Sequence, residues 1–140
     1  MDANVLLYTL DTANPRKQAA AVRWRDALWE QEVGRLSWQV LNELYANATR
    51  KLAVPANIAR ALVRSYAQWP VIEFGLALVE RAWHWTDRAD INYWDALILA
   101  AGERAGCRWL LSEDFQEGRK YGSVEVVNPF RTGPERVLGS

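Results

Sequence analysis

Two aspartates lie where a folded chain exposes side chains that can do chemistry. Asp114 follows the apolar segment 109–111, where a predicted strand gives way to polar residues and a loop containing Gly118. Asp95 lies in the first turn or so of a predicted helix whose other face is apolar, with Ala96, Leu97, Leu99 and Ala100. Ligands of open α/β sheets bind beyond the carboxyl ends of the strands, so acids after strands and near helix starts are candidate site residues. Carboxylates favour hard divalent cations such as Mg²⁺ or Mn²⁺.

The composition excludes several other kinds of site. One histidine, His84, and one cysteine, Cys107, are too few for a Cys/His zinc site or an intramolecular disulfide. Seventeen acidic and seventeen basic side chains cancel, so any nucleic acid must be bound by a local patch rather than by a global positive field. No signal peptide or membrane-spanning segment is apparent, and we expect a cytoplasmic protein with no membrane partner.

Helices are indicated by caps and by apolar spacing. Asn14 and Pro15 begin the first confident helix, and Ser37 is a candidate N-cap for a helix through Lys51 that carries Glu43. Further helices are predicted from Pro55 to about residue 69, over residues 76–85, and around Asp95 after a cap at Asp90 or Asn92.

Short β-rich segments separate these helices. They cover residues 71–73, 107–111 and 124–127, while residues 2–8 are either a short buried strand or a strand end that runs into a turn. Strands separated by helices need crossover connections, so we predict an α/β fold with a mainly parallel central sheet flanked by helices on both faces. Residues 1–140 are expected to form a single domain.

Five segments together resemble the successive motifs of PIN-domain ribonucleases, especially VapC-type toxins of type II toxin–antitoxin systems. Their order and spacing match over nearly the whole chain, which makes the resemblance specific although each motif alone is weak. The segments are residues 2–8 (DANVLLY), 39–45 (QVLNELY), 93–98 (YWDALI), 110–114 (LLSED) and 127–130 (VNPF).

The resemblance implies a set of site residues. Asp2, Glu43, Asp95 and Asp114 match the acidic positions that bind Mg²⁺ or Mn²⁺ and carry catalysis, and Asn4 and Ser112 match polar positions beside them. Two carboxylates about 4 Å apart repel by roughly 4 kcal/mol at an effective dielectric near 20, so four of them need cations to gather. Such an ion can activate a water for phosphodiester hydrolysis. Glu113 is an alternative ligand, although a solvated loop carboxylate is the expected role.

The chain departs from the family pattern at its start. Members usually place an apolar strand before the first aspartate, whereas here only Met1 precedes Asp2. We therefore expect the first strand to be shortened or missing, or the natural chain to begin further upstream. In either case Asp2 would be held less firmly than in other members, because a shortened central strand forms fewer hydrogen bonds with its neighbours.

Basic and aromatic residues could contribute to binding. Two basic pairs, Arg50 with Lys51 and Arg119 with Lys120, follow acidic segments and could contact an RNA backbone, although cations at a helix C-terminus also have a dipole role. His84 is expected to be structural. Most of the eight tryptophans are expected in the core or in a dimer interface, including Trp24, Trp29, Trp69 and Trp83.

Two functions from different classes follow from the sequence. The first is a metal-dependent endoribonuclease, for which the resemblance implies an RNA substrate, a homodimer and a small antitoxin protein as partner. The second is a catalytically inactive, dimeric PIN-like interaction protein that has lost its metal through the defective first motif. A haloacid-dehalogenase-like phosphotransferase is set aside, because it needs an acid two residues after the first aspartate and Asn4 stands there.

Overall fold

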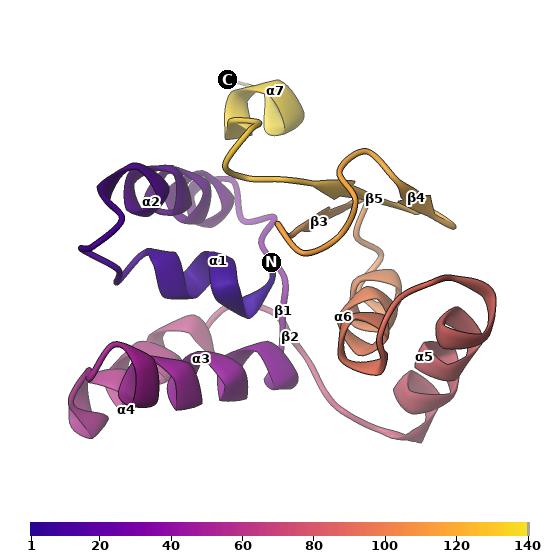
Figure 1. Ribbon diagram of the computed structural model, residues 1–140, viewed down its shortest axis with the longest axis horizontal. Coiled ribbons are helices and arrows are strands. Elements are labelled where there is room, and N and C mark those ends of the chain that lie inside the picture. Colours follow the sequence, from indigo (N-terminus) through magenta and orange to yellow (C-terminus); the bar gives the residue numbers. More distant parts are fainter. Residues whose placement is uncertain (140) are drawn as a thin grey trace.

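Helices surround two small sheets in the computed structural model, which describes residues 1–139 (Figure 1). The helices are α1 (Ala3–Tyr8), α2 (Pro15–Glu30), α3 (Trp38–Lys51), α4 (Ala56–Tyr66), α5 (Leu76–Arg88), α6 (Tyr93–Arg104) and α7 (Pro134–Leu138). The strands are β1 (Leu36–Ser37), β2 (Val71–Ile72), β3 (Trp109–Leu111), β4 (Lys120–Tyr121) and β5 (Val124–Val127). The α/β class with mainly parallel strands is confirmed.

Capping side chains set the starts of the two helices that carry Glu43 and Asp95. The Ser37 hydroxyl accepts a hydrogen bond from the Val40 amide at 3.2 Å, as predicted for the N-cap of α3. Asn92, rather than Asp90, caps α6 by accepting from the Asp95 amide at 2.9 Å. Helix α4 ends three residues earlier than predicted and α5 continues three residues further, which is the usual uncertainty at helix ends.

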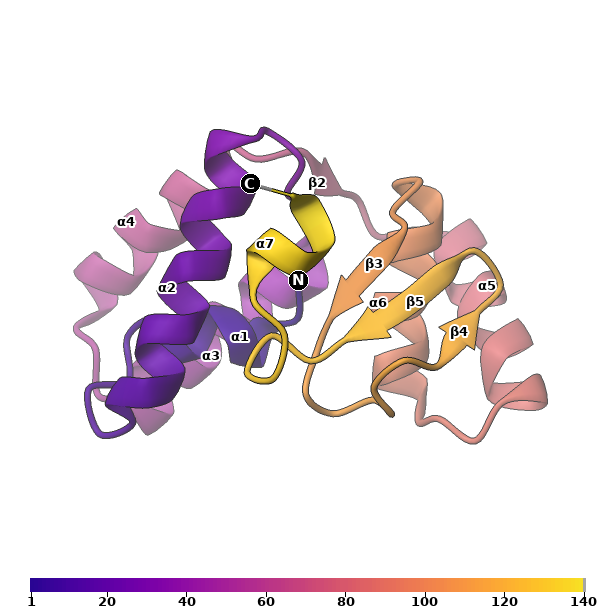
Figure 2. The same ribbon diagram turned by 90° about the horizontal axis from the view of Figure 1, so that it is seen from above.

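The strands fall into two sheets instead of one. Strand β1 pairs in parallel with β2, and β3 pairs in parallel with β5, while β4 adds to β5 in the antiparallel direction (Figure 2). Strand β4 was not predicted, because its two residues give no alternation to detect. Gly118 and Gly122, on either side of it, have φ values of 80° and 62°, which only glycine adopts readily.

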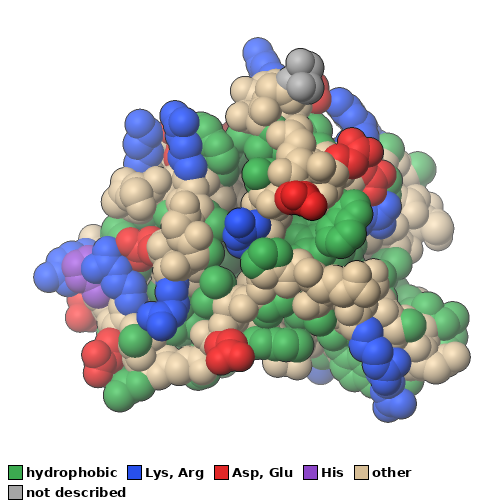
Figure 3. Space-filling view, turned by 180° about the vertical axis from the view of Figure 1, so that it is seen from behind, with side chains coloured by type: hydrophobic (Ala, Val, Ile, Leu, Met, Phe, Trp, Pro, Cys, Tyr) green, Lys and Arg blue, Asp and Glu red, His purple; other side chains and the backbone are tan. Residues whose placement is uncertain are grey.

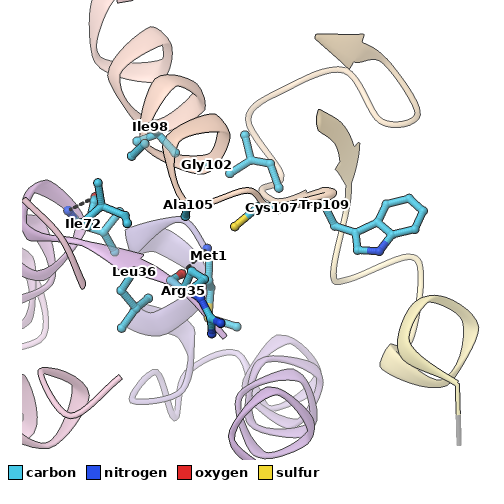
Figure 4. Close-up of a pocket in the computed structure, with 13 residues that line it drawn as sticks. Met1, Arg35, Leu36, Ile72, Ile98, Gly102, Ala105, Cys107 and Trp109 are labelled. Carbon is cyan, nitrogen blue, oxygen red and sulfur yellow. Dashed lines mark hydrogen bonds between the residues drawn. The ribbon is translucent and has the colours of Figure 1, made fainter. Parts of the chain in front are cut away.

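The first residues lie between the two sheets. The Met1 amino group donates to the Arg35 carbonyl at 3.3 Å, and the Asp2 amide donates to the Leu111 carbonyl at 2.9 Å. Figure 4 shows Met1 in this gap, between Leu36 on one side and Cys107 and Trp109 on the other. The expectation of a strand over residues 2–8 is wrong: Asp2 is extended as the N-cap of α1, and the helix begins at Ala3.

The helices pack in two groups. Helix α1 lies between α2 and α3, whereas α6 packs on β3 and β5 and is covered by α5. Trp24 and Trp69 are buried as expected, but Trp29 and Trp83 are about half exposed and so are not core residues. In the part of the chain that the structure describes, every helix is too short or too polar to cross a membrane.

Candidate active site

Two of the acids are connected at the end of β3, and we call Asp2 and Asp114 the strand-end pair. The buried Ser112 hydroxyl donates to the Asp2 carboxylate at 2.9 Å and accepts from the Asp114 amide at 3.1 Å. Ser112 is itself fixed by its amide, which donates to the Val127 carbonyl of β5 at 3.1 Å. A single hydroxyl therefore orients both acids, which agrees with the place predicted for Ser112 beside the site.

Helix α1 makes a second connection to this pair. The Asn4 side-chain amide donates to the Asp114 carboxylate at 3.2 Å, in a part of the site that is open to solvent. Asn4 lies in the first turn of α1, two residues after Asp2. The structure therefore places Asn4 close to the acids, although it lies on a helix rather than on a strand.

The other two acids, Glu43 and Asp95, are carried by helices, and we call them the helix pair. The side-chain amide of Gln39 donates to the Glu43 carboxylate at 3.1 Å and to the Trp94 carbonyl at 3.2 Å. Because Trp94 immediately precedes Asp95, this one amide ties α3 to the first turn of α6.

Asp95 is also held by the cap of its own helix. The Asn92 side chain accepts from the Asp95 amide at 2.9 Å and donates to the Asp95 carboxylate at 3.0 Å. This reciprocal pair fixes the carboxylate at the amino end of α6, where the helix dipole favours negative charge. The remaining oxygen of Asp95 takes no part in this cap and is available to another partner.

Electrostatic repulsion couples the two pairs. Burial raises the pKa of Asp95 to about 6, and the charges of Asp2 and Asp114 contribute next. The pKa of Glu43 is raised chiefly by burial, with further contributions from Asp2 and Asp114. Burial also raises the pKa of Asp2, against the opposing hydrogen bond from Ser112. Acids on four separate segments thus share one excess of negative charge.

The side chains suit a hard divalent cation in kind, because all four candidate ligands are carboxylates. The N-terminus is the one cation among the charges that shift their pKa values in the described residues. The spacing is wider than that of a closed metal site. Within residues 1–139 no three His, Cys, Asp or Glu side chains are close enough together to enclose an ion. An ion held here would therefore keep several waters, as Mg²⁺ usually does.

The remaining candidates lie around this cluster. Glu113 forms an ion pair with Lys17 at 2.9 Å, which gives it a structural role on the loop. The four basic side chains predicted near RNA are exposed: Arg50 and Lys51 in the last turn of α3, and Arg119 and Lys120 around the start of β4. Lys120 lies 3.9 Å from Glu125, and Arg119 stands over the Tyr121 ring.

Gln39 is a site residue to which the sequence analysis gave no role. The sequence does contain a signal for this role, because Gln39 and Glu43 are four residues apart on one helix and the side chains of such pairs face each other. What the sequence does not reveal is the second bond, from Gln39 to the Trp94 carbonyl, which depends on how α3 and α6 pack.

Comparison with known families agrees with this geometry. A family model described as the PIN domain matches residues 1–120. The chain belongs to the PIN-domain family. PIN domains are commonly nucleases that bind nucleic acid and generally use divalent metal ions, and this chain is accordingly read as a nuclease. The comparison with curated proteins gave no match.

Proposed function

We propose that this PIN domain is a metal-dependent endoribonuclease in which Asp2, Glu43, Asp95 and Asp114 hold Mg²⁺ or Mn²⁺. One observation carries the proposal: four acids from separate segments are coupled, because burial raises the pKa of Asp95 to about 6 and the charges of Asp2, Asp114 and Glu43 add to the shift. Because these acids come from distant parts of the sequence, their mutual repulsion is a cost that folding would avoid unless a cation relieved it.

The side chains divide the work of such a reaction. A bound divalent ion would supply an acidified water and neutralise charge on the scissile phosphate. Ser112 and Asn4 orient the strand-end pair, while Gln39 and Asn92 orient the helix pair, and a hydrated ion between the two pairs would be held by carboxylates of both. No histidine is required for this chemistry.

Substitution of Asp95 by asparagine tests the proposal, because the amide keeps the shape of the side chain and removes its charge. Asp95→Asn should lower RNA cleavage in Mg²⁺ by about a thousandfold, as expected when a metal ligand and its charge are lost. Asp87→Asn on α5, an exposed position outside the site, should cleave like the wild type. Full cleavage by Asp95→Asn, with the fold intact by circular dichroism, would refute the proposed role.

The biological setting is proposed from the resemblance to VapC-type toxins. Residues 1–140 would act as one domain in a cytoplasmic homodimer, restrained by a small antitoxin protein. Four carboxylates suit an arginine side chain from such a partner, since arginine binds carboxylates through two parallel hydrogen bonds. A neighbouring reading frame that encodes a short DNA-binding protein, and that suppresses toxicity when expressed together with this chain, would support the pairing.

One observation favours the alternative of an inactive, dimeric interaction protein. The acids in residues 1–139 do not form a compact group of three metal ligands. Calorimetric titration with Mn²⁺ separates the two functions. Binding that is lost in Asp95→Asn supports the nuclease, whereas no binding to the folded wild type supports the interaction protein.

A further inference from the structure

An exposed tryptophan stands beside the acidic cluster. Trp94 is 62% exposed, the largest exposed fraction among the tryptophans that the structure shows at the surface. It occupies the first turn of α6, immediately before Asp95, whereas residues 96–101 of the same helix are all buried. The indole is therefore open to contact by a ligand bound at the acids.

The backbone of Trp94 is fixed between two of the acids. Its carbonyl accepts from the Gln39 amide at 3.2 Å, and the same amide donates to Glu43 at 3.1 Å. Consecutive Cα atoms are about 3.8 Å apart, so the Trp94 side chain starts next to that of Asp95. A phosphodiester bound by the acids would therefore place its neighbouring nucleotides within reach of the indole.

The indole is also braced in position. The Tyr93 ring meets the Trp94 ring edge-on, with 5.4 Å between the centroids. Tyr93 in turn packs against a buried cluster formed by Ala82, Ala96 and Leu97 of helices α5 and α6. A ring held in this way loses little conformational freedom when a flat ligand stacks on its free face.

We propose that Trp94 stacks on the nucleobase of an unpaired nucleotide next to the scissile phosphate, and so selects single-stranded segments as substrate. The proposal rests on the proposed nuclease function. Stacking would supply affinity that charge does not, because the net charge is zero and acidic and basic side chains are intermixed on the face in Figure 3. A paired base is already stacked within its helix and cannot cover the indole.

Two features favour a nucleotide over a protein as the partner. Trp94 is tied through its backbone carbonyl and Gln39 to Glu43 and immediately precedes Asp95, so a nucleotide strand bound at the acids would lie near the indole. The other half-exposed tryptophans stand elsewhere, since Trp29 stacks on Trp69 and Trp83 lies on α5. Trp83 therefore provides a matched control.

Binding of a short labelled single-stranded RNA, measured by fluorescence anisotropy in Ca²⁺ with Glu43→Gln as the common background, tests the stacking. Trp94→Ala should weaken binding by about tenfold to a hundredfold, which is the range for loss of one stacked base. Trp94→Phe should retain most of the affinity, and Trp83→Ala should retain all of it. In the cleaving protein Trp94→Ala should raise KM more than it lowers kcat.

An abasic substitution in the RNA isolates the proposed contact. One abasic nucleotide beside the cleavage site should weaken RNA binding to the protein that retains Trp94 as much as Trp94→Ala does. The same abasic nucleotide should not weaken binding further in the Trp94→Ala variant. Wild-type protein should cleave the single strand at least tenfold faster than the same sequence in a duplex.

The outcomes separate the two proposals. If the wild type cleaves no RNA with Mg²⁺ or Mn²⁺, the proposed function fails and the stacking role fails with it. If the wild type cleaves RNA but Trp94→Ala binds and cleaves equally well, the stacking role alone is overturned. It is also overturned if Trp94→Ala changes only the oligomeric state in light scattering, which would assign the indole to a protein interface.

Discussion

The strand-end pair and the helix pair are held in different ways. Glu43 and Asp95 lie on helices of 14 and 12 residues, each begun by a capping side chain. Asp2 lies in a two-residue segment that no strand pairing secures, and Asp114 lies in an exposed loop. The helix pair therefore takes its position from long elements, whereas the strand-end pair depends on the backbone bond from Asp2 to Leu111 and on a few side-chain hydrogen bonds.

This difference predicts which substitutions should disturb the site most. Asp2 is buried although the pKa of its carboxyl is raised by that burial, so its charged form depends on the Ser112 hydroxyl. Asp95 is half-buried and held twice by its cap, because the Asn92 side chain accepts from the Asp95 amide and donates to the Asp95 carboxylate. Loss of one hydrogen bond should consequently matter more for the strand-end pair than for the helix pair.

Ser112→Ala should have the largest effect of the supporting substitutions. It removes the donor to Asp2 and the acceptor of the Asp114 amide together, and orienting groups beside metal ligands typically contribute 10–100-fold in affinity or activity. We expect cleavage to fall about a hundredfold and the free energy of unfolding to fall by about 1–3 kcal/mol. Initial rates and urea titrations measure the two effects.

Ser112→Thr is the matched control, because it keeps the hydroxyl. It should retain most of the activity, with a smaller loss of stability from the methyl group added at a buried position. Equal activity of Ser112→Ala and the wild type would contradict the role given to this hydroxyl.

Gln39→Ala should have a smaller effect. Glu43 would lose one donor and Trp94 its carbonyl partner, but α3 and α6 would still hold both acids through their caps. About a tenfold loss of Mn²⁺ affinity is expected, measured by calorimetry. A loss as large as that of Ser112→Ala would break the distinction between the two pairs.

The same distinction explains how much the sequence could predict. Helices α3 and α6, with Glu43 and Asp95, follow from local signals: Ser37 and Asn92 as caps and apolar residues on one face. Strands β3 and β5 are apolar segments between glycines and helices, so the position of Asp114 after β3 was also readable. Local chemistry determines all of these features.

Residues 2–8 could not be read in that way. Their apolar run fits a strand or a buried helix, and the choice depends on whether neighbouring strands offer partners for more than two residues. The division of the sheet and the Gln39 bond to Trp94 are likewise products of packing between distant segments. Family resemblance supplied the four acids, but the hydrogen bonds that hold them required the structure.

The pH dependence of stability tests the electrostatic part of the comparison. Asp95, with its pKa raised to about 6, keeps its proton in the folded protein at pH values where the unfolded chain has lost it. The folded state then binds more protons between about pH 4 and 6, so stability without metal falls as pH rises through this window. In Asp95→Asn the free energy of unfolding should fall by less over this pH window than in the wild type. The difference should be on the order of 1 kcal/mol, because solvent screens a half-buried carboxyl.

Thermal unfolding in EDTA at pH 4.5 and pH 7 measures this difference, with Asp87→Asn as the control that should follow the wild type. Mn²⁺ should recover stability at pH 7 in the wild type and much less in Asp95→Asn, because the ion binds the deprotonated acids. A pH profile unchanged by Asp95→Asn would mean that the acids do not share their charge.

Asn4→Ala should have the smallest effect. The bond from Asn4 to Asp114 is 3.2 Å long and exposed, so water can replace the lost donor at little cost. Ser112 still holds the Asp114 amide in this variant. We expect cleavage within about threefold of the wild type and a change in unfolding free energy within about 0.5 kcal/mol. A loss comparable to that of Ser112→Ala would place Asn4 in contact with metal or substrate, and would make α1, rather than the end of β3, the element that positions the strand-end pair.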